Sequence, residues 1–106
     1  MIVLTLKGKA APDHCRELLR SLTTMLGHVR QFKGCLNCHC YRSVENEYEF
    51  CFIEQWSTQE HLNTYMHSDL FCAIHGAFKI LTDPSDIEMT AVEVMTWNGV
   101  LPSGKP

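Results

Sequence analysis

The spacing of hydrophobic residues along this chain changes several times, and each change predicts a new structural element. Apolar and polar residues alternate over 2–7, which is typical of a strand. Over 12–29 the spacing becomes three and four residues, which predicts an amphipathic helix that packs by one stripe. The stripe consists of Cys15, Leu18, Leu19, Leu22, Met25, Leu26 and Val29. Pro12 suits the first position of this helix because it has no N–H that needs a partner there.

The rest of the chain predicts two strands over 35–43 and 47–56, helices over 58–66 and 68–81, and a last strand beginning near 87. The resulting order is strand, helix, strand, strand, split helix, strand. This is the β-α-β-β-α-β plan of a ferredoxin-like α+β fold, in which four antiparallel strands carry helices on one face. We expect one domain over 1–96, followed by a flexible tail over 97–106.

Several residues predict where these elements begin and end. Ser57 is a suitable N-cap for the first short helix, and Glu60 completes a capping box. Ser68 is expected to cap the second, and Pro84 follows its predicted end. In the last strand, the alternation of apolar residues changes phase over 91–94. We expect a β-bulge there, or a strand that leaves its sheet to join another subunit.

The register of the predicted hairpin decides which side chains share a face. A two-residue turn at 45–46 would place Asn37 opposite Glu54 and His39 opposite Phe52. A shift of one residue would exchange the two faces of the strand, so the register remains open.

The strand over 47–56 carries the most informative chemistry. Its aromatic residues fall on one face, and so does the carboxylate of Glu54; the aromatic residues are Tyr48, Phe50, Phe52 and Trp56. An acid in an apolar row must be hydrogen-bonded, paired with a cation or neutral. Glu54 is therefore either an acid in a ligand pocket with a raised pKa, or a structural carboxylate. The pocket would lie between this strand and the helices.

Size and charge restrict the classes of function. The chain has 106 residues and a net charge of −3, without a cluster of Lys and Arg. These features are not those of a protein that binds nucleic acid. No apolar run approaches the roughly 20 residues of a membrane span, and 1–7 lacks the features of a signal peptide. We expect a cytoplasmic protein that does not associate with a membrane.

The chain contains six cysteines, which we expect to be reduced. Cys35, Cys38 and Cys40 form a C-x-x-C-x-C pattern within a predicted strand. There Cys38 and Cys40 share a face and Cys35 points the other way. A structural zinc site would need a fourth ligand and a tight knuckle, so small core residues are the preferred interpretation and no metal site is assigned.

Three short segments resemble the antibiotic biosynthesis monooxygenase superfamily: 33–36 (KGCL), 53–57 (IEQWS) and 65–71 (YMHSDLF). The resemblance extends over about 1–96. It implies a dimeric α+β barrel, in which two sheets of a homodimer pack face to face and the last strand helps to join the subunits. It also implies a small-molecule pocket between the sheet and the helices of each protomer.

The resemblance implies a monooxygenase that needs no cofactor and oxidises a small aromatic or quinol-like substrate with molecular oxygen. The superfamily also contains haem-degrading enzymes. His75 matches their iron ligand, but Tyr65 occupies the position of their pocket tryptophan and the first strand lacks their asparagine. The segment 96–102 is similar to the end of a sugar-phosphate isomerase group, although no phosphate clamp is evident. A non-catalytic binding or redox-sensing module is a further alternative.

Glu54, Tyr65 and His75 are the candidates for catalytic proton handling. Five residues are candidates for substrate binding: Asn37, His39, Phe50, Phe52 and Trp56. Each also has a structural interpretation, as a core residue or as a residue exposed on the sheet or helix surface.

Overall fold

The predicted order of elements is confirmed by the computed structural model, which describes residues 1–82 and 87–94. The elements are β1 (Ile2–Lys9), η1 (Pro12–His14), α1 (Cys15–Arg30), β2 (Cys35–Arg42), β3 (Glu49–Trp56), α2 (Gln59–Met66), α3 (Asp69–Leu81) and β4 (Glu88–Glu93). The predicted tail over 97–106 and the domain end at 96 lie outside the described residues.

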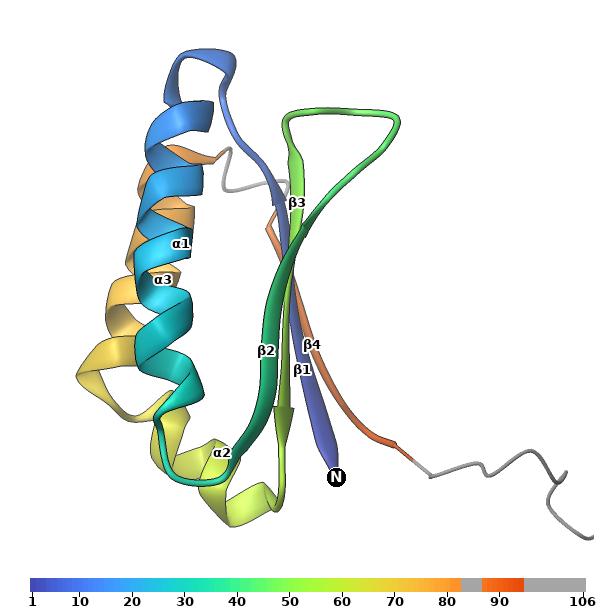
Figure 1. Ribbon diagram of the computed structural model, residues 1–106, viewed down its shortest axis with the longest axis vertical. Helices are drawn as coiled ribbons and strands as arrows, with labels where there is room; N and C mark the ends of the chain where they lie inside the picture. Colours follow the sequence, from blue (N-terminus) through green and yellow to red (C-terminus); the bar gives the residue numbers. More distant parts are fainter. Residues whose placement is uncertain (83–86, 95–106) are drawn as a thin grey trace, which may run out of the picture.

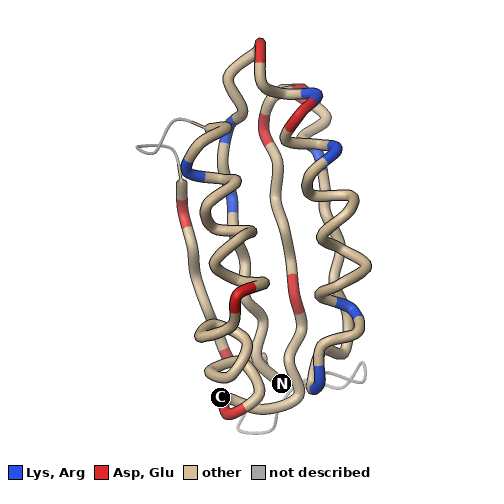
Figure 2. Tube along the Cα trace, turned by 90° about the vertical axis from the view of Figure 1, so that its left-hand side faces the viewer, with Lys and Arg blue, Asp and Glu red and all other residues tan. Residues whose placement is uncertain are grey.

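The four strands form one antiparallel sheet in the order β2-β3-β1-β4. Figure 1 shows α1 and α3 side by side over one face of this sheet. No helix formed by residues 1–82 and 87–94 covers the opposite face, which is called the uncovered face. Among the described residues, no helix is long and apolar enough to span a membrane. Basic and acidic positions are interspersed, with most of them near the ends of helices and strands (Figure 2).

The core lies between the sheet and the helices. Even-numbered residues of β1 and β3 face the helices and are buried, whereas the odd-numbered residues face the uncovered side. This alternation is the one that the sequence predicts for both strands. The largest fully buried side chains are Trp56, Tyr65, Phe50, Phe52, Phe78, Leu18, Leu22, Leu62, Ile74, Val29 and Cys38.

The register of the β2–β3 hairpin differs from the register that a two-residue turn predicts. Cys35 lies opposite Trp56 as expected, but the register shifts between Cys35 and Asn37, so that Cys38 lies opposite Glu54. The turn is also longer, because β2 ends at 42 and β3 begins at 49. The shift is an irregularity of the kind a β-bulge produces, in which one extra residue reverses the alternation of the strand. Cys35 therefore packs against the core on the same face as Cys38, contrary to the prediction.

Two predicted helix starts require correction. The N-cap of α2 is Thr58, whose hydroxyl accepts a hydrogen bond from the N–H of His61, and Ser57 instead contacts the imidazole of His61. Pro12 begins the 3₁₀ turn η1 rather than the α-helix itself. The predicted cap at Ser68 is confirmed, because its hydroxyl accepts from the N–H of Phe71.

The last strand contains no bulge within Glu88–Glu93, although the change of phase in the sequence suggested one. All six residues pair with β1 in continuous register, and all six are exposed. Val92 lies opposite Val3 on the uncovered face of the sheet, and Ala91 lies opposite Leu4 on the other. The change of phase therefore reflects a strand with apolar residues on both faces.

Candidate functional site

Glu54 is the centre of a buried polar cluster on β3. The side chain is only 2% exposed, and both carboxyl oxygens accept hydrogen bonds. The indole N–H of Trp56 donates to Oε1 at 3.1 Å, and the hydroxyl of Tyr65 donates to Oε2 at 2.8 Å. Trp56 lies two residues further along β3 on the same face, and Tyr65 projects from α2. Because α2 begins directly after β3, the helix brings the phenol ring of Tyr65 back over the strand.

Aromatic rings surround this cluster. Trp56 and Tyr65 stack with their ring centroids 4.5 Å apart and an angle of 27° between the planes. Phe32, in the α1–β2 connection, packs edge-on against both, at 5.9 Å from Trp56 and 5.5 Å from Tyr65. Phe71 of α3 packs edge-on against Tyr65 at 5.3 Å. The carboxyl of Glu54 is thus enclosed by groups that exclude water.

Burial raises the pKa of Glu54 from 4.5 to about 7, and the hydrogen bonds from Tyr65 and Trp56 lower it in part. Burial also raises the pKa of Tyr65, and the nearby carboxylate raises it further. Tyr65 therefore remains a hydrogen-bond donor at neutral pH. Glu54 is an acid that gains and loses its proton near physiological pH, which is the property required of a general base or acid.

The predicted site residues separate into three groups. Five of them lie between the sheet and the helices and are buried: Glu54, Tyr65, Phe50, Phe52 and Trp56. His75 of α3 is half-buried and stacks on Phe71 at 5.9 Å, and Phe71 in turn packs against Tyr65, the residue that donates to Glu54. Asn37 and His39 lie opposite Gln55 and Ile53 on the uncovered face of the sheet, so the expectation that they share the face of Glu54 was wrong.

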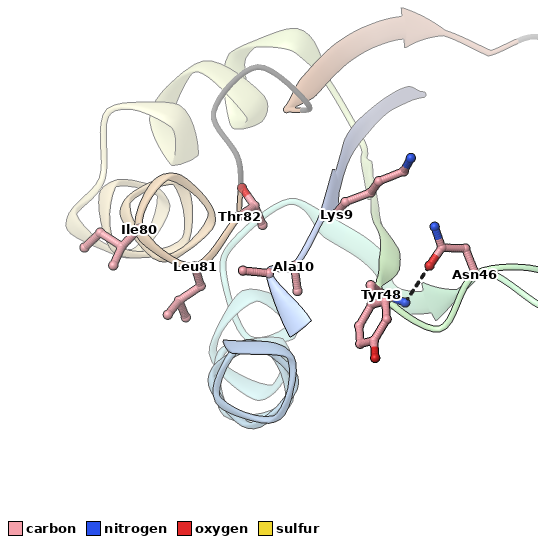
Figure 3. Close-up of a pocket in the computed structure, with 8 residues that line it drawn as sticks. Lys9, Ala10, Asn46, Tyr48, Ile80, Leu81 and Thr82 are labelled. Atoms are coloured by element: carbon pink, nitrogen blue, oxygen red, sulfur yellow. Dashed lines mark hydrogen bonds between the residues drawn. The ribbon is translucent and has the colours of Figure 1, made fainter. Parts of the chain in front are cut away.

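The space around Glu54 is filled by side chains rather than open. None of the four best-formed cavities among residues 1–82 and 87–94 is lined by Glu54. One of these cavities, with a volume of about 410 Å³, lies at the opposite end of the molecule, where Ala10 and Thr82 form an isolated antiparallel β-bridge. In Figure 3 the ring of Tyr48 and the side chain of Leu81 lie on either side of Ala10. This cavity is separate from the Glu54 cluster, so a ligand reaches Glu54 only after side chains move.

Three contributors to the site were missed by the sequence analysis: Phe32, Cys38 and Phe71. Phe32 precedes the Lys33-Gly34 segment, and its position before the turn that returns the chain to the sheet was the available signal. Cys38 lies opposite Glu54 because of the shifted register. Burial raises the pKa of Cys38, and the charge of Glu54 raises it further, so this thiol is an uncharged part of the wall.

The chain belongs to the antibiotic biosynthesis monooxygenase family, whose model matches residues 1–77. This match covers β1 to most of α3 and includes every residue of the Glu54 cluster. Membership supports a general monooxygenase-type function. A comparison with curated proteins gives no match.

Solved structures share the fold at low sequence identity. A Deinococcus radiodurans protein provisionally assigned to the same family has a TM-score of 0.84 and 21% identity, covering 96% of this chain and 100% of that chain. Rv0793 of Mycobacterium tuberculosis has a TM-score of 0.81 and 16% identity, with coverages of 92% and 97%. A variant of SnoaB, a cofactor-independent oxygenase of Streptomyces nogalater, has a TM-score of 0.78 and 9% identity, with coverages of 93% and 97%.

Proposed function

We propose that this protein is a cofactor-independent monooxygenase that oxidises a small aromatic, quinol-like substrate between its sheet and helices. The observation that carries this proposal is the buried carboxyl of Glu54, which accepts hydrogen bonds from Tyr65 and Trp56. Burial raises the pKa of this carboxyl to about 7. The family supports the same reaction class. SnoaB, which shares the fold, is a cofactor-independent oxygenase.

The reaction begins with removal of a proton from the substrate. The ionised carboxylate of Glu54 accepts the phenolic proton, and the O–H of Tyr65 donates a hydrogen bond that holds the carboxylate in place. The surrounding aromatic rings exclude water, so the phenolate formed is poorly solvated and electron-rich. Trp56, Phe50 and Phe52 form the apolar walls against which a planar ring packs.

The phenolate then reacts with molecular oxygen. It transfers one electron to O₂, and the resulting substrate radical and superoxide combine to form a carbon–oxygen bond. The peroxide takes the proton held by Glu54 and becomes a hydroperoxide at a carbon that still bears one hydrogen. Loss of water from that carbon leaves a carbonyl, so one oxygen atom enters the product and the other leaves in water. The substrate itself supplies both electrons, and the carboxylate is regenerated.

The alternative of a redox-sensing module in the cysteine-rich hairpin receives little support from the four thiols of that hairpin. Burial raises the pKa of Cys35, Cys38, Cys40 and Cys51, which keeps these thiols protonated and unreactive near neutral pH. Within residues 1–82 and 87–94, no group of three or more His, Cys, Asp and Glu side chains is placed to hold a metal.

We also propose a homodimer formed through the uncovered face of the sheet. Apolar side chains of three strands lie on this face, among them Val3, Ile53 and Val92, and Val92 is 56% exposed. An exposed apolar sheet face indicates an interaction surface.

Oxygen uptake with a panel of purified quinols and phenols tests the proposed reaction. The wild-type protein, freed of flavin, haem and metal, is expected to consume one O₂ for each quinone formed. Glu54→Gln removes the base and should lower kcat by roughly 10²- to 10⁴-fold. Glu45→Gln is the matched control, because Glu45 is exposed in the β2–β3 loop. Absence of uptake with the whole panel, or equal rates for both variants, would contradict the proposal.

A further inference from the structure

Phe32 lies on the boundary between the buried Glu54 cluster and a surface cleft. The cleft has a volume of about 330 Å³ and is lined by Phe32, Lys33, Glu60, His61 and Thr64. Phe32 is the one residue of these five whose ring also packs against Trp56 and Tyr65. The half-buried ring of Phe32 therefore borders both the cleft and the two side chains that donate to the carboxyl of Glu54.

Hydrogen bonds hold the backbone around this cleft. The N–H of Ser57 donates to the carbonyl of Gly34 at 2.9 Å, which ties the α1–β2 connection to the start of α2. Gly34 has a φ of +91°, and its missing Cβ leaves room for the ring of His61. The N–H of Phe32 donates a hydrogen bond to the carbonyl of Val29, and the carbonyl of Phe32 accepts one from the N–H of Cys35, each at 3.0 Å. Rotation of the Phe32 side chain is therefore the movement that would open the cleft toward Trp56 and Tyr65 without breaking these backbone bonds.

Phe71, the second ring that packs edge-on against Tyr65, does not line this cleft. Phe71 packs edge-on against Tyr65 much as Phe32 does, at 5.3 Å compared with 5.5 Å. None of the four best-formed cavities among residues 1–82 and 87–94 is lined by Phe71, and the ring of His75 stacks on its far side. Two aromatic rings thus cover Tyr65 in similar geometry, and of the two only Phe32 lines one of these four cavities.

We propose that the cleft at Phe32 is the entrance and outer binding subsite of the Glu54 site, and that Phe32 is the residue that closes it. Its ligand is a planar aromatic compound with an ionisable hydroxyl, a class that follows from the proposed function. The ligand ring takes the place of the Phe32 ring against Trp56 and Tyr65. Its hydroxyl points inward to Glu54, while Lys33, His61 and Thr64 contact the end that remains in the cleft.

Stopped-flow binding of 2-naphthol, a planar phenol, tests this route. Thr64→Phe fills the cleft without touching the Glu54 cluster and is expected to slow association severalfold. Ile80→Phe is the matched control, because Ile80 is exposed and lines the larger cavity at the other end of the molecule. Association should be unchanged in that variant. Equal association rates for the two variants, or no binding to the wild-type protein, would overturn the proposal.

Acrylamide quenching of Trp56 fluorescence provides a second measurement, in a Trp97→Phe background that leaves Trp56 as the only tryptophan. Phe32→Ala is expected to raise the quenching constant severalfold, and Phe71→Ala should leave it nearly unchanged. A larger effect of Phe71→Ala would place the entrance on the other flank and overturn the proposal. Because neither measurement depends on oxygen, the entrance stands if they succeed and oxygen uptake fails. In that case only the proposed reaction is lost.

Discussion

The hydroxyl of Tyr65 donates a 2.8 Å hydrogen bond to Oε2 of Glu54 in a part of the core where the carboxyl is almost fully buried. Among residues 1–82 and 87–94, no cation forms an ion pair with this carboxyl. Its charged form is therefore held by two neutral donors, Tyr65 and Trp56, and is penalised by burial. The protonation state of Glu54 is therefore expected to change with pH near neutrality, and this change affects the stability of the protein.

The free energy of unfolding should fall as the pH rises from about 4.5 to about 7. The folded protein holds the proton of Glu54 in this range while the unfolded chain releases it, because the pKa is about 7 when folded and 4.5 when unfolded. The stabilisation that comes from the protonated Glu54 is complete below its pKa in the unfolded chain, 4.5, and is lost as the pH rises through its pKa in the folded protein, about 7. The loss is about 3 kcal/mol. Urea unfolding at pH 5 and pH 8 measures it.

Glu54→Gln serves as the control for this titration, since glutamine has no proton to lose in the same range. The variant should show a smaller loss of stability between pH 5 and pH 8 than the wild-type protein. The same loss in both proteins would mean that another group is responsible.

Removing the hydroxyl of Tyr65 should destabilise the protein more at pH 8 than at pH 5. Tyr65→Phe leaves Oε2 of Glu54 without its donor, and an unsatisfied buried group costs about 1–3 kcal/mol. The cost is larger when the carboxyl is ionised. Tyr41→Phe is the matched control, because Tyr41 is 53% exposed on β2. Equal effects of the two substitutions in urea unfolding would show that the Tyr65 hydrogen bond contributes nothing measurable.

Gly34 and Gly27 should respond in opposite directions to substitution by alanine. Gly34 has a φ of +91°, and an added Cβ would collide with the side chain of His61. Gly34→Ala is expected to cost about 2 kcal/mol or more. Gly27 lies within α1 with open space at its Cβ position, so Gly27→Ala should stabilise by about 0.5–1 kcal/mol. Thermal unfolding of both variants measures the difference, and a neutral Gly34→Ala would contradict the observed packing.

A charge at the centre of the uncovered sheet face should weaken the proposed dimer. Ile53 lies on this face, between Thr5 of β1 and His39 of β2. We expect sedimentation to give twice the chain mass for the wild-type protein and a shift toward the monomer for Ile53→Asp. Val44→Asp is the control, because Val44 is fully exposed in the β2–β3 loop. A monomeric wild-type protein would exclude the dimer.

The fold could be predicted from the sequence because its elements carry strong local signals. The alternation in β1 and β3 and the three-four spacing of α1 agree with the structure almost to their ends. The register of β2 could not be predicted, because an irregularity near Leu36 leaves no signature in an edge strand with one fully buried residue and no strict alternation. That single shift moved Asn37 and His39 to the other face and placed Cys38 opposite Glu54.

The site could be predicted only in part, for a similar reason. Glu54 and Trp56 share a strand face, so the period of two places them together. The contacts of Phe32 and Phe71 with Tyr65 depend on how three separate segments pack, which spacing along the chain does not encode. The indirect contact of His75 with Tyr65, through Phe71, depends on the same packing.

The titration of Glu54 itself is the most direct test of this account. The ¹³C chemical shift of its side-chain carboxyl, followed by NMR from pH 3 to pH 9 and assigned with Glu54→Gln, reports the ionisation of this one group. The account predicts a midpoint at about 7, well above the ordinary value of 4.5. A midpoint near 4.5 would mean that the carboxyl is solvated and charged at neutral pH, and it would contradict the buried proton acceptor on which the proposed reaction depends.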